Sequence, residues 1–222
     1  MPSWYNIQGI YVWNQQVRPK WWKPWSHTIA YYPLHENTDE VMGNYSWTWG
    51  SATFGDNMAT VTSRLYRSWT FFHGYTGDFT ISAYVKMTTS PSYWGIMFKS
   101  DSGYNASLEI SSYYAWTNNG ANKWAWVSYY NSWWYYKSSV GTNGGIYNVI
   151  WVKSSWTMYV YVNWSQIWTF TAWNYPWSWW SSWDTANIPT WVICADVIIE
   201  NIAWTADEVS EYYNQTKWTY WL

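Results

Sequence analysis

Few side chains in this sequence have the types and spacing of a catalytic centre. The acids nearest to a catalytic pair are Asp196 and Glu200, in the apolar segment 192–200. Glycoside hydrolysis uses two carboxyl groups about 5–5.5 Å apart when configuration is retained and about 6.5–9.5 Å apart when it is inverted. On an extended strand, four residues separate the two backbones by about 13 Å, which disfavours a pair. Glu109 stands alone, and a partner acid from another strand is left open.

Other catalytic and metal-binding patterns are missing from the sequence. Neither a Gly-x-Ser-x-Gly nucleophile elbow nor a phosphate-binding Gly-rich loop is present. His27, His35 and His73 have no ligand-like spacing, and we expect each to be a surface or loop histidine. Cys194 is the only cysteine, which excludes an internal disulfide and a cysteine-based zinc site. We expect its thiol to be a small buried apolar group.

Tyrosine pairs give a better signal for binding than any residue gives for catalysis. A tyrosine ring offers a flat apolar face and a polar tip, which suits contacts with sugars or proteins. In a strand, neighbouring side chains point to opposite faces, so we expect one ring of each pair to face the core and the other to face outward. Ordinary sandwich packing is the alternative for any single tyrosine. The predicted ligand-binding residues are Tyr113, Tyr114, Tyr129, Tyr130, Tyr135 and Tyr136.

These residues must be positioned by strands, because the chain alternates with period two. In the segment Phe79–Lys86, apolar residues at odd positions alternate with mostly polar ones, the pattern of a half-buried strand. Turn-rich breaks separate many such segments, and no helix lies between them, which favours a sandwich or barrel. The predicted strands are 28–32, 79–86, 94–99, 106–112, 124–130, 147–153, 157–163, 166–171 and 192–200.

One helix is predicted, close to the end of the chain. Thr205 and Glu208 have the spacing of a capping box, in which each side chain binds the other residue's backbone N–H. Trp204 and Val209 occupy the positions of a hydrophobic staple. Val209 would begin an inward stripe that continues with Tyr212 and Tyr213 over two to three turns.

Length and charge indicate one domain and exclude some partners. We interpret residues 1–26 as an extended leader and 27–222 as one sandwich domain. The 11 Lys and Arg against 13 Asp and Glu are scattered, so neither a nucleic-acid site nor a polybasic membrane site is expected. The longest apolar stretch, Val192–Ile199, is too short for a membrane helix, so no membrane insertion is expected. No signal peptide is visible at the N-terminus.

Tryptophan is unusually frequent, with 27 Trp against 12 Gly. Trp164 follows Asn163 in a predicted two-residue hairpin turn, where the favoured turn needs positive φ at both residues. Asn tolerates that conformation and Trp does not. We hypothesise that 18 tryptophans are UGA codons that the native host, bacterial or phage, reads as glycine; a truly Trp-rich adhesive protein is the alternative. The candidates are Trp13, Trp21, Trp47, Trp49, Trp69, Trp133, Trp134, Trp156, Trp164, Trp168, Trp173, Trp177, Trp179, Trp180, Trp183, Trp191, Trp218 and Trp221.

Five segments follow one another in order from residue 27 onward: the opening His27–Leu34, the strand Phe79–Lys86, the strand Met158–Asn163, the closing strand Val197–Asn201 and the capped helix ending Glu211–Asn214. In this order they resemble the laminin G-like, concanavalin A-like jelly rolls of lectins and glucanases. The resemblance implies an all-β, two-sheet antiparallel jelly-roll sandwich, here with one short C-terminal helix. Members of this family bind carbohydrates or proteins at surfaces, and similar proteins occur in phage tails and on cell surfaces.

The same family includes glucanases and calcium-binding members. Retaining glucanases of this kind carry closely alternating acids on one strand, and this sequence shows none. Calcium is left open by the resemblance, with Asp56, Asp78 and Asp101 as loop candidates. Single acids in turns are usually turn formers, so no metal ligand and no cofactor are assigned.

We therefore expect a non-catalytic recognition module that binds carbohydrate or protein at a cell or particle surface. The first alternative is a structural or assembly protein of a surface layer or phage-like tail, with self-association through sheet edges. The second is a glycoside hydrolase of the glucanase type. Expected partners are a glycan or a surface protein, and the expected location is extracellular, on a cell surface or on a virion.

Overall fold

The computed structural model describes residues 26–43, 45–69, 77–86, 96–100, 106–111, 124–131, 134–142, 144–171, 184–188, 190–220 and 222. The predicted leader lies outside these residues, apart from Ser26, and the division into leader and domain stays a prediction. The described strands are β1 (Thr28–Tyr32), β2 (Trp49–Gly55), β3 (Met58–Trp69), β4 (Phe79–Lys86), β5 (Ile96–Ser100), β6 (Ala106–Ser111), β7 (Trp124–Asn131), β8 (Trp134–Thr142), β9 (Ile146–Ser154), β10 (Thr157–Val162), β11 (Ser165–Thr171), β12 (Asp184–Ile188) and β13 (Ile193–Glu200).

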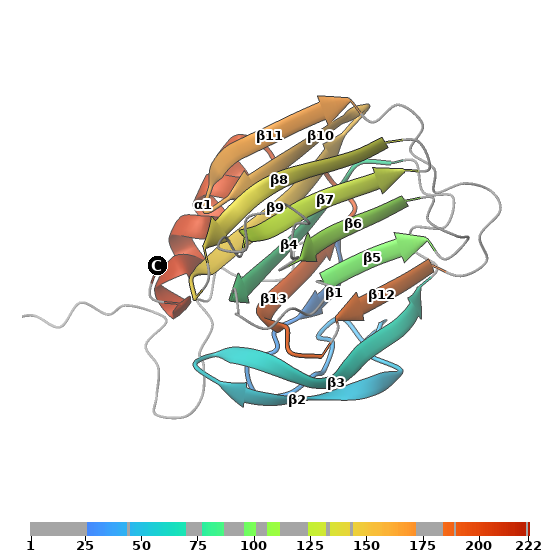
Figure 1. Ribbon diagram of the computed structural model, residues 1–222, viewed down its shortest axis with the longest axis vertical. Coiled ribbons are helices and arrows are strands. Elements are labelled where there is room, and N and C mark those ends of the chain that lie inside the picture. Colours follow the sequence, from blue (N-terminus) through green and yellow to red (C-terminus); the bar gives the residue numbers. More distant parts are fainter. Residues whose placement is uncertain are drawn as a thin grey trace, which may run out of the picture.

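The described strands form an antiparallel sandwich. The order along the sheet is β11-β10-β9-β4-β13-β3-β12-β5-β6-β7-β8, while β1 pairs with β13 and β2 pairs with β3. In Figure 1, β5 to β8 pass in front of β4, β9 and β13, so the sheet folds over into two layers. We call β5 to β8 the front layer, and β4, β9 and β13 the rear layer. The long strand β3 joins the layers, because its start at Ala59 and Thr60 pairs with β13 and its end, from Leu65 onward, pairs with β12. The predicted fold class is confirmed.

The strands of the rear layer are buried on both faces. One face of β4, with Phe79 and Ile81, joins the main core cluster. The prediction that β4 is half-buried is wrong, because Thr80, Ser82 and Tyr84 on the other face are also fully buried. The C-terminal helix and the segment just before it cover this second face together. The Thr80 hydroxyl donates to the carbonyl of Ile202 at 2.8 Å.

The covering element is helix α1 (Ala206–Thr216), which continues into the 3-10 helix η1 (Lys217–Tyr220). The predicted capping box is confirmed: the Glu208 N–H donates to the Thr205 hydroxyl at 3.2 Å, and the Thr205 N–H donates to the Glu208 carboxylate at 2.7 Å. The predicted stripe is buried, and it packs on the sheet face opposite the front layer (Figure 1). At 11 residues, this helix is too short and too polar to cross a bilayer.

Sequence patterns located most of the described strands and missed four. Each predicted strand is present, with ends that differ by at most two residues. The missed strands are β2, β3, β8 and β12. Strand β2 was missed because six of its seven residues are exposed, so its sequence has no alternating apolar pattern to detect. Cys194 is fully buried as predicted, and burial raises the pKa of its thiol to about 12.

Two of the tryptophans that the structure describes adopt a backbone conformation that favours glycine. Trp164 has φ of 70°, next to Asn163 at 47°, which is the turn that the sequence predicts between β10 and β11. Trp191 has φ of 72° at the turn before β13. Both side chains are more than half exposed, so little packing compensates the backbone strain.

Replacing either tryptophan by glycine is expected to stabilise the fold. The left-handed conformation costs an L-residue about 1–2 kcal/mol, and glycine loses about 0.5–1 kcal/mol through its greater freedom in the unfolded chain. Trp164→Gly and Trp191→Gly should each raise the free energy of unfolding by about 0.5–1 kcal/mol, measured by urea titration with circular dichroism. Trp156→Gly is the control, because Trp156 is exposed but has no left-handed φ. This variant should be less stable than the unchanged protein. Equal losses in all three variants would contradict the prediction.

Candidate functional site

Five neighbouring strands place one residue each in a single row across the sheet. Thr53 of β2 lies opposite Thr60 of β3, and Thr60 lies opposite Ile193 of β13. Lys86 of β4 lies opposite Ile193 on one side and Ile146 of β9 on the other. Directly paired residues lie on the same face of a sheet. The strand register therefore builds one continuous surface from segments that are far apart in the sequence.

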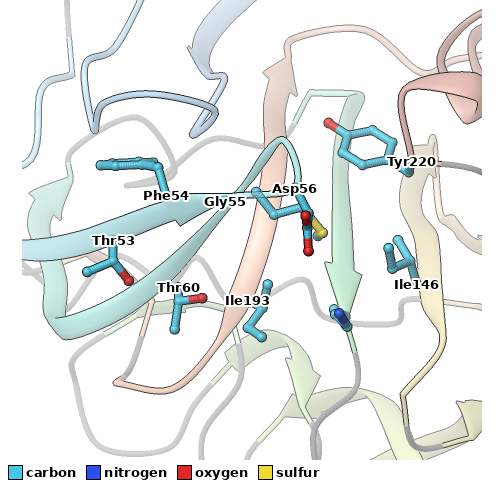
Figure 2. A pocket seen from close by; sticks show the side chains of 10 residues that line it. Thr53, Phe54, Gly55, Asp56, Thr60, Ile146, Ile193 and Tyr220 are labelled. Atoms are coloured by element: carbon cyan, nitrogen blue, oxygen red, sulfur yellow. The ribbon is translucent and has the colours of Figure 1, made fainter.

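This row is the floor of a pocket of about 530 Å³ on the helix-covered face of the sheet. One wall is the tip of the β2–β3 hairpin, with Phe54, Gly55, Asp56 and Met58, and Tyr220 of η1 forms another wall. In the view of Figure 2, Phe54 and Tyr220 lie on the two sides of the Gly55–Asp56 turn. The pocket thus lies where the cover of the C-terminal helix ends.

The hairpin tip is held against the C-terminal segment. Asp56 and Asn57 have φ of 54° and 60°, so both central residues of the turn are left-handed. Asp and Asn are the residues that tolerate this conformation best after glycine. The Asn57 amide donates to the carbonyl of Thr219 at 3.2 Å. This bond links the two walls of the pocket.

Tyr220 is fixed from behind by a buried polar cluster. Its hydroxyl donates to the Asp196 carboxylate at 2.7 Å, and its ring stacks on Tyr84 at 4.0 Å. The Tyr31 hydroxyl donates to the same carboxylate at 2.5 Å, and His35 Nε2 lies 3.2 Å from it and 3.0 Å from the Tyr220 hydroxyl. His35 lies in a loop, as one form of the prediction has it, and these contacts bury its side chain. His27 is exposed as predicted, and His73 lies outside the described residues.

Asp196 is an ionised acid in a buried site. Burial opposes its ionisation, but the hydrogen bonds from His35, Tyr31 and Tyr220 and the charge of His35 hold its pKa below the usual value. Its backbone has φ of 47°, and its N–H donates to the carbonyl of Pro33 at 2.9 Å. Sequence reasoning missed this cluster, because its members are distant along the chain.

The acids considered for catalysis have structural contacts. Asp196 serves the cluster just described. Glu200 is buried and accepts from the Thr28 hydroxyl at 2.8 Å and from Trp204 Nε1 at 2.6 Å, and burial raises its pKa. Glu109 lies in β6, paired with Met97 and with Ser128 of β7 in the backbone register. None of these acids lines the pocket.

Four of the predicted ligand-binding tyrosines belong to strands β7 and β8, and the other two lie outside the described residues. In the register of β7 and β8, Tyr129 pairs with Tyr136 and Tyr130 pairs with Tyr135. The register therefore places the two pairs on opposite faces of the sheet. Tyr113 and Tyr114 are outside the described part of the chain. Their role in binding stays a prediction.

The described residues do not gather a metal site. No group of three or more His, Cys, Asp or Glu side chains that could hold a metal ion occurs among them. Asp78 accepts from the backbone N–H of Ser155 at 2.6 Å and lies 4.0 Å from Lys153 Nζ. Asp56 lines the pocket, and Asp101 lies outside the described residues.

Comparison with known proteins identifies the fold. No family model and no curated protein matches the sequence. A structure from work on the cell entry of botulinum neurotoxin type C and its two ganglioside molecules matches with a TM-score of 0.59 at 12% identity over 85% of this chain. The binding domain of botulinum neurotoxin DC with SialylT gives 0.60 at 11% identity, again over 85%. Domain 4 of a GH43 extracellular arabinanase from Geobacillus stearothermophilus, with arabinotriose, gives 0.55 at 14% identity over 83%.

The lengths of these matches differ. The chain spans about half of the two toxin structures, 51% in each case, and 97% of the arabinanase domain. The likeness shows a β-sandwich shared with carbohydrate- and receptor-binding domains. The laminin G-like and concanavalin A-like assignment stays a resemblance.

Removing the Asp196 charge tests whether the cluster holds the C-terminal segment. Asp196→Asn removes the charge and replaces one of the two acceptor oxygens by an NH₂ donor, so a buried tyrosine hydroxyl loses its acceptor and the free energy of unfolding at pH 7 should fall by about 2–4 kcal/mol. Because its pKa is lowered in the folded state, Asp196 contributes stability above its ordinary pKa of about 3.9, and this is lost as pH falls through the lower folded-state value. The measurement is denaturant unfolding between pH 2 and 7. Asp39→Asn, at an exposed acid, should behave like the unchanged protein. An equal loss of stability in acid for Asp196→Asn and the unchanged protein would refute the role.

Proposed function

We propose that this chain is a non-catalytic recognition module that binds carbohydrate in the pocket beside its C-terminal helix. The observation that carries this proposal is the mixture of groups around one pocket. Ile146 and Ile193 offer apolar side chains on the floor, while Thr53 and Thr60 offer hydroxyls. Asp56 supplies acceptors and Lys86 supplies donors. A sugar has apolar C–H faces and many hydroxyls, so it needs this combination.

The structural neighbours support binding as the activity. They are binding domains described with gangliosides, with SialylT and, in one case, with rat synaptotagmin II. The arabinanase domain holds a saccharide, arabinotriose. Sugar or protein recognition by this sandwich fits the proposed location outside cells, on a cell surface or on a virion.

Assembly into a surface layer or tail is the second candidate, and the edge strand β2 favours it. Among the described strands, β2 pairs with β3 alone, which leaves its other edge for another chain. It is mostly exposed on both faces, with Trp49 half exposed. Pairing through this edge would link copies of the chain.

The tryptophan hypothesis gains support from exposure and from backbone conformation. The buried Trp151 and Trp204 are not among the 18 candidates. The described tryptophans that are strongly exposed are all candidates: Trp49, Trp156, Trp164, Trp191 and Trp218. Two candidates fit it less well, because Trp47 and Trp168 pack against the core. We propose that the left-handed positions 164 and 191 are glycine in the native host.

The intact mass of the protein from its native host tests this proposal directly. Glycine at the candidate positions lowers the mass, because each replacement removes an indole side chain. Agreement with the 26.7 kDa of the printed sequence would refute it. The described part of the pocket does not depend on the outcome, since none of its ten described lining residues is a tryptophan.

Carbohydrate binding is tested with a glycan array followed by calorimetric titration of the best ligand. Ile146→Ala should weaken binding about 5- to 30-fold, because it removes apolar surface from the floor of the pocket. Ile167→Ala is the matched control, since Ile167 is an exposed isoleucine of β11 and is not among the described residues that line the pocket. A well-folded protein that retains no glycan would contradict the proposal. Oligomers in light scattering would then favour assembly.

A further inference from the structure

The floor of the pocket carries a positive charge whose counter-charge is missing among the described residues. Lys86 lies between Ile193 and Ile146 in the cross-strand row and is partly buried there. No carboxylate in the described part of the chain lies within 4.0 Å of its ammonium group, and no hydrogen bond from it is found there. A partly desolvated ammonium group between two apolar side chains gains more from an anion than an exposed one does.

The other described basic side chains differ from Lys86 in this respect. Lys153, on the neighbouring strand β9, donates to the carbonyl of Gly77 at 2.8 Å and faces Asp78. Arg64 donates to the side-chain carbonyl of Asn187 at 2.6 Å, and Lys217 donates to that of Asn214 at 2.9 Å. Arg67 donates to the carbonyl of Ser46. Among the basic residues whose side chains the structure describes in β3, β4, β9 and η1, Lys86 is therefore the one for which neither a hydrogen bond nor a carboxylate partner is found, and it lines a pocket.

Asp56 does not neutralise this lysine. It lies on the exposed hairpin tip, farther from Lys86 than an ion-pair distance, and also lines the pocket. The pocket thus has a positive floor and a negative rim. Because the formal net charge of the chain is −2, attraction of an anion to this place must come from the local lysine and not from the overall field.

We propose that the pocket selects acidic saccharides, with Lys86 Nζ donating to an anionic group of the sugar at the floor. This inference rests on the proposed carbohydrate function. Asp56 accepts hydrogen bonds from sugar hydroxyls at the rim and disfavours a second anionic group there. The ligand is accordingly a sugar with one negative group, a carboxylate or a sulfate, and neutral hydroxyls elsewhere.

The test compares matched sugars on the full chain. The probes are neutral oligosaccharides, the same oligosaccharides with one uronic or sialic acid, and the same with one sulfate. The unchanged protein should bind one of the acidic sets at least about tenfold more tightly than the neutral set, as a charge-assisted hydrogen bond provides. The stronger acidic set identifies carboxylate or sulfate as the group.

Lys86 variants separate this inference from the general proposal. Lys86→Met removes the charge and keeps an unbranched apolar side chain, so the ratio of acidic-sugar affinity to neutral-sugar affinity should fall to about one. Lys86→Arg should keep the preference. Lys217→Met, outside the pocket, is the charge-matched control. Circular dichroism and the urea midpoint check folding, and Lys86→Gln is a second neutral variant.

Each outcome points to one conclusion. Equal binding of acidic and neutral sugars by the unchanged protein overturns the inference and leaves the proposed function standing. Loss of the acidic preference in Lys217→Met as well as Lys86→Met also overturns it, because the effect would then be general charge. Absence of binding to every sugar refutes the proposed function itself.

Discussion

Burial of the rear layer on both faces is the constraint on which the rest of the structure depends. Strands β4, β9 and β13 face the front layer on one side and the C-terminal segment on the other. Every polar side chain on the second face must therefore find a partner within the protein. Thr80 bonds to the segment before the helix, and Asn148 donates to the Ser82 hydroxyl at 3.2 Å. The capped helix completes the cover, so the helix and the sheet stabilise each other.

Burial on both faces also explains why the two acids of β13 have structural contacts and not the geometry of a catalytic pair. Asp196 and Glu200 both belong to β13, where water is excluded. Asp196 receives enough hydrogen bonds to favour its charged form, while desolvation dominates at Glu200 and raises its pKa. Their hydrogen bonds attach η1 and the Trp204 segment to the sheet. The positions that looked nearest to a catalytic pair in the sequence therefore hold the cover in place.

The sequence predicted those parts of the fold whose signal is local. Alternation identified strands such as β4, and the Thr205 and Glu208 spacing identified the helix start. An exposed strand such as β2 leaves no such pattern. The pocket was missed because its floor depends on register between distant segments, which no single stretch encodes. One local sign existed: Asp56 and Asn57 between two extended segments indicate a hairpin turn. Nothing local distinguished Lys86 from any lysine at the end of a strand.

Recognition and assembly use different atoms of β2. Pairing with another chain occupies backbone N–H and C=O groups along the strand edge, in the plane of the sheet. The pocket opens on the face of the sheet, where Thr53 extends the cross-strand row. A copy joined through its β2 edge would keep the floor of its pocket, including Lys86. Repeated copies would then present repeated pockets, and weak affinity for a single sugar would be multiplied by simultaneous contacts with a surface. The edge and the pocket can therefore serve one function in a surface structure.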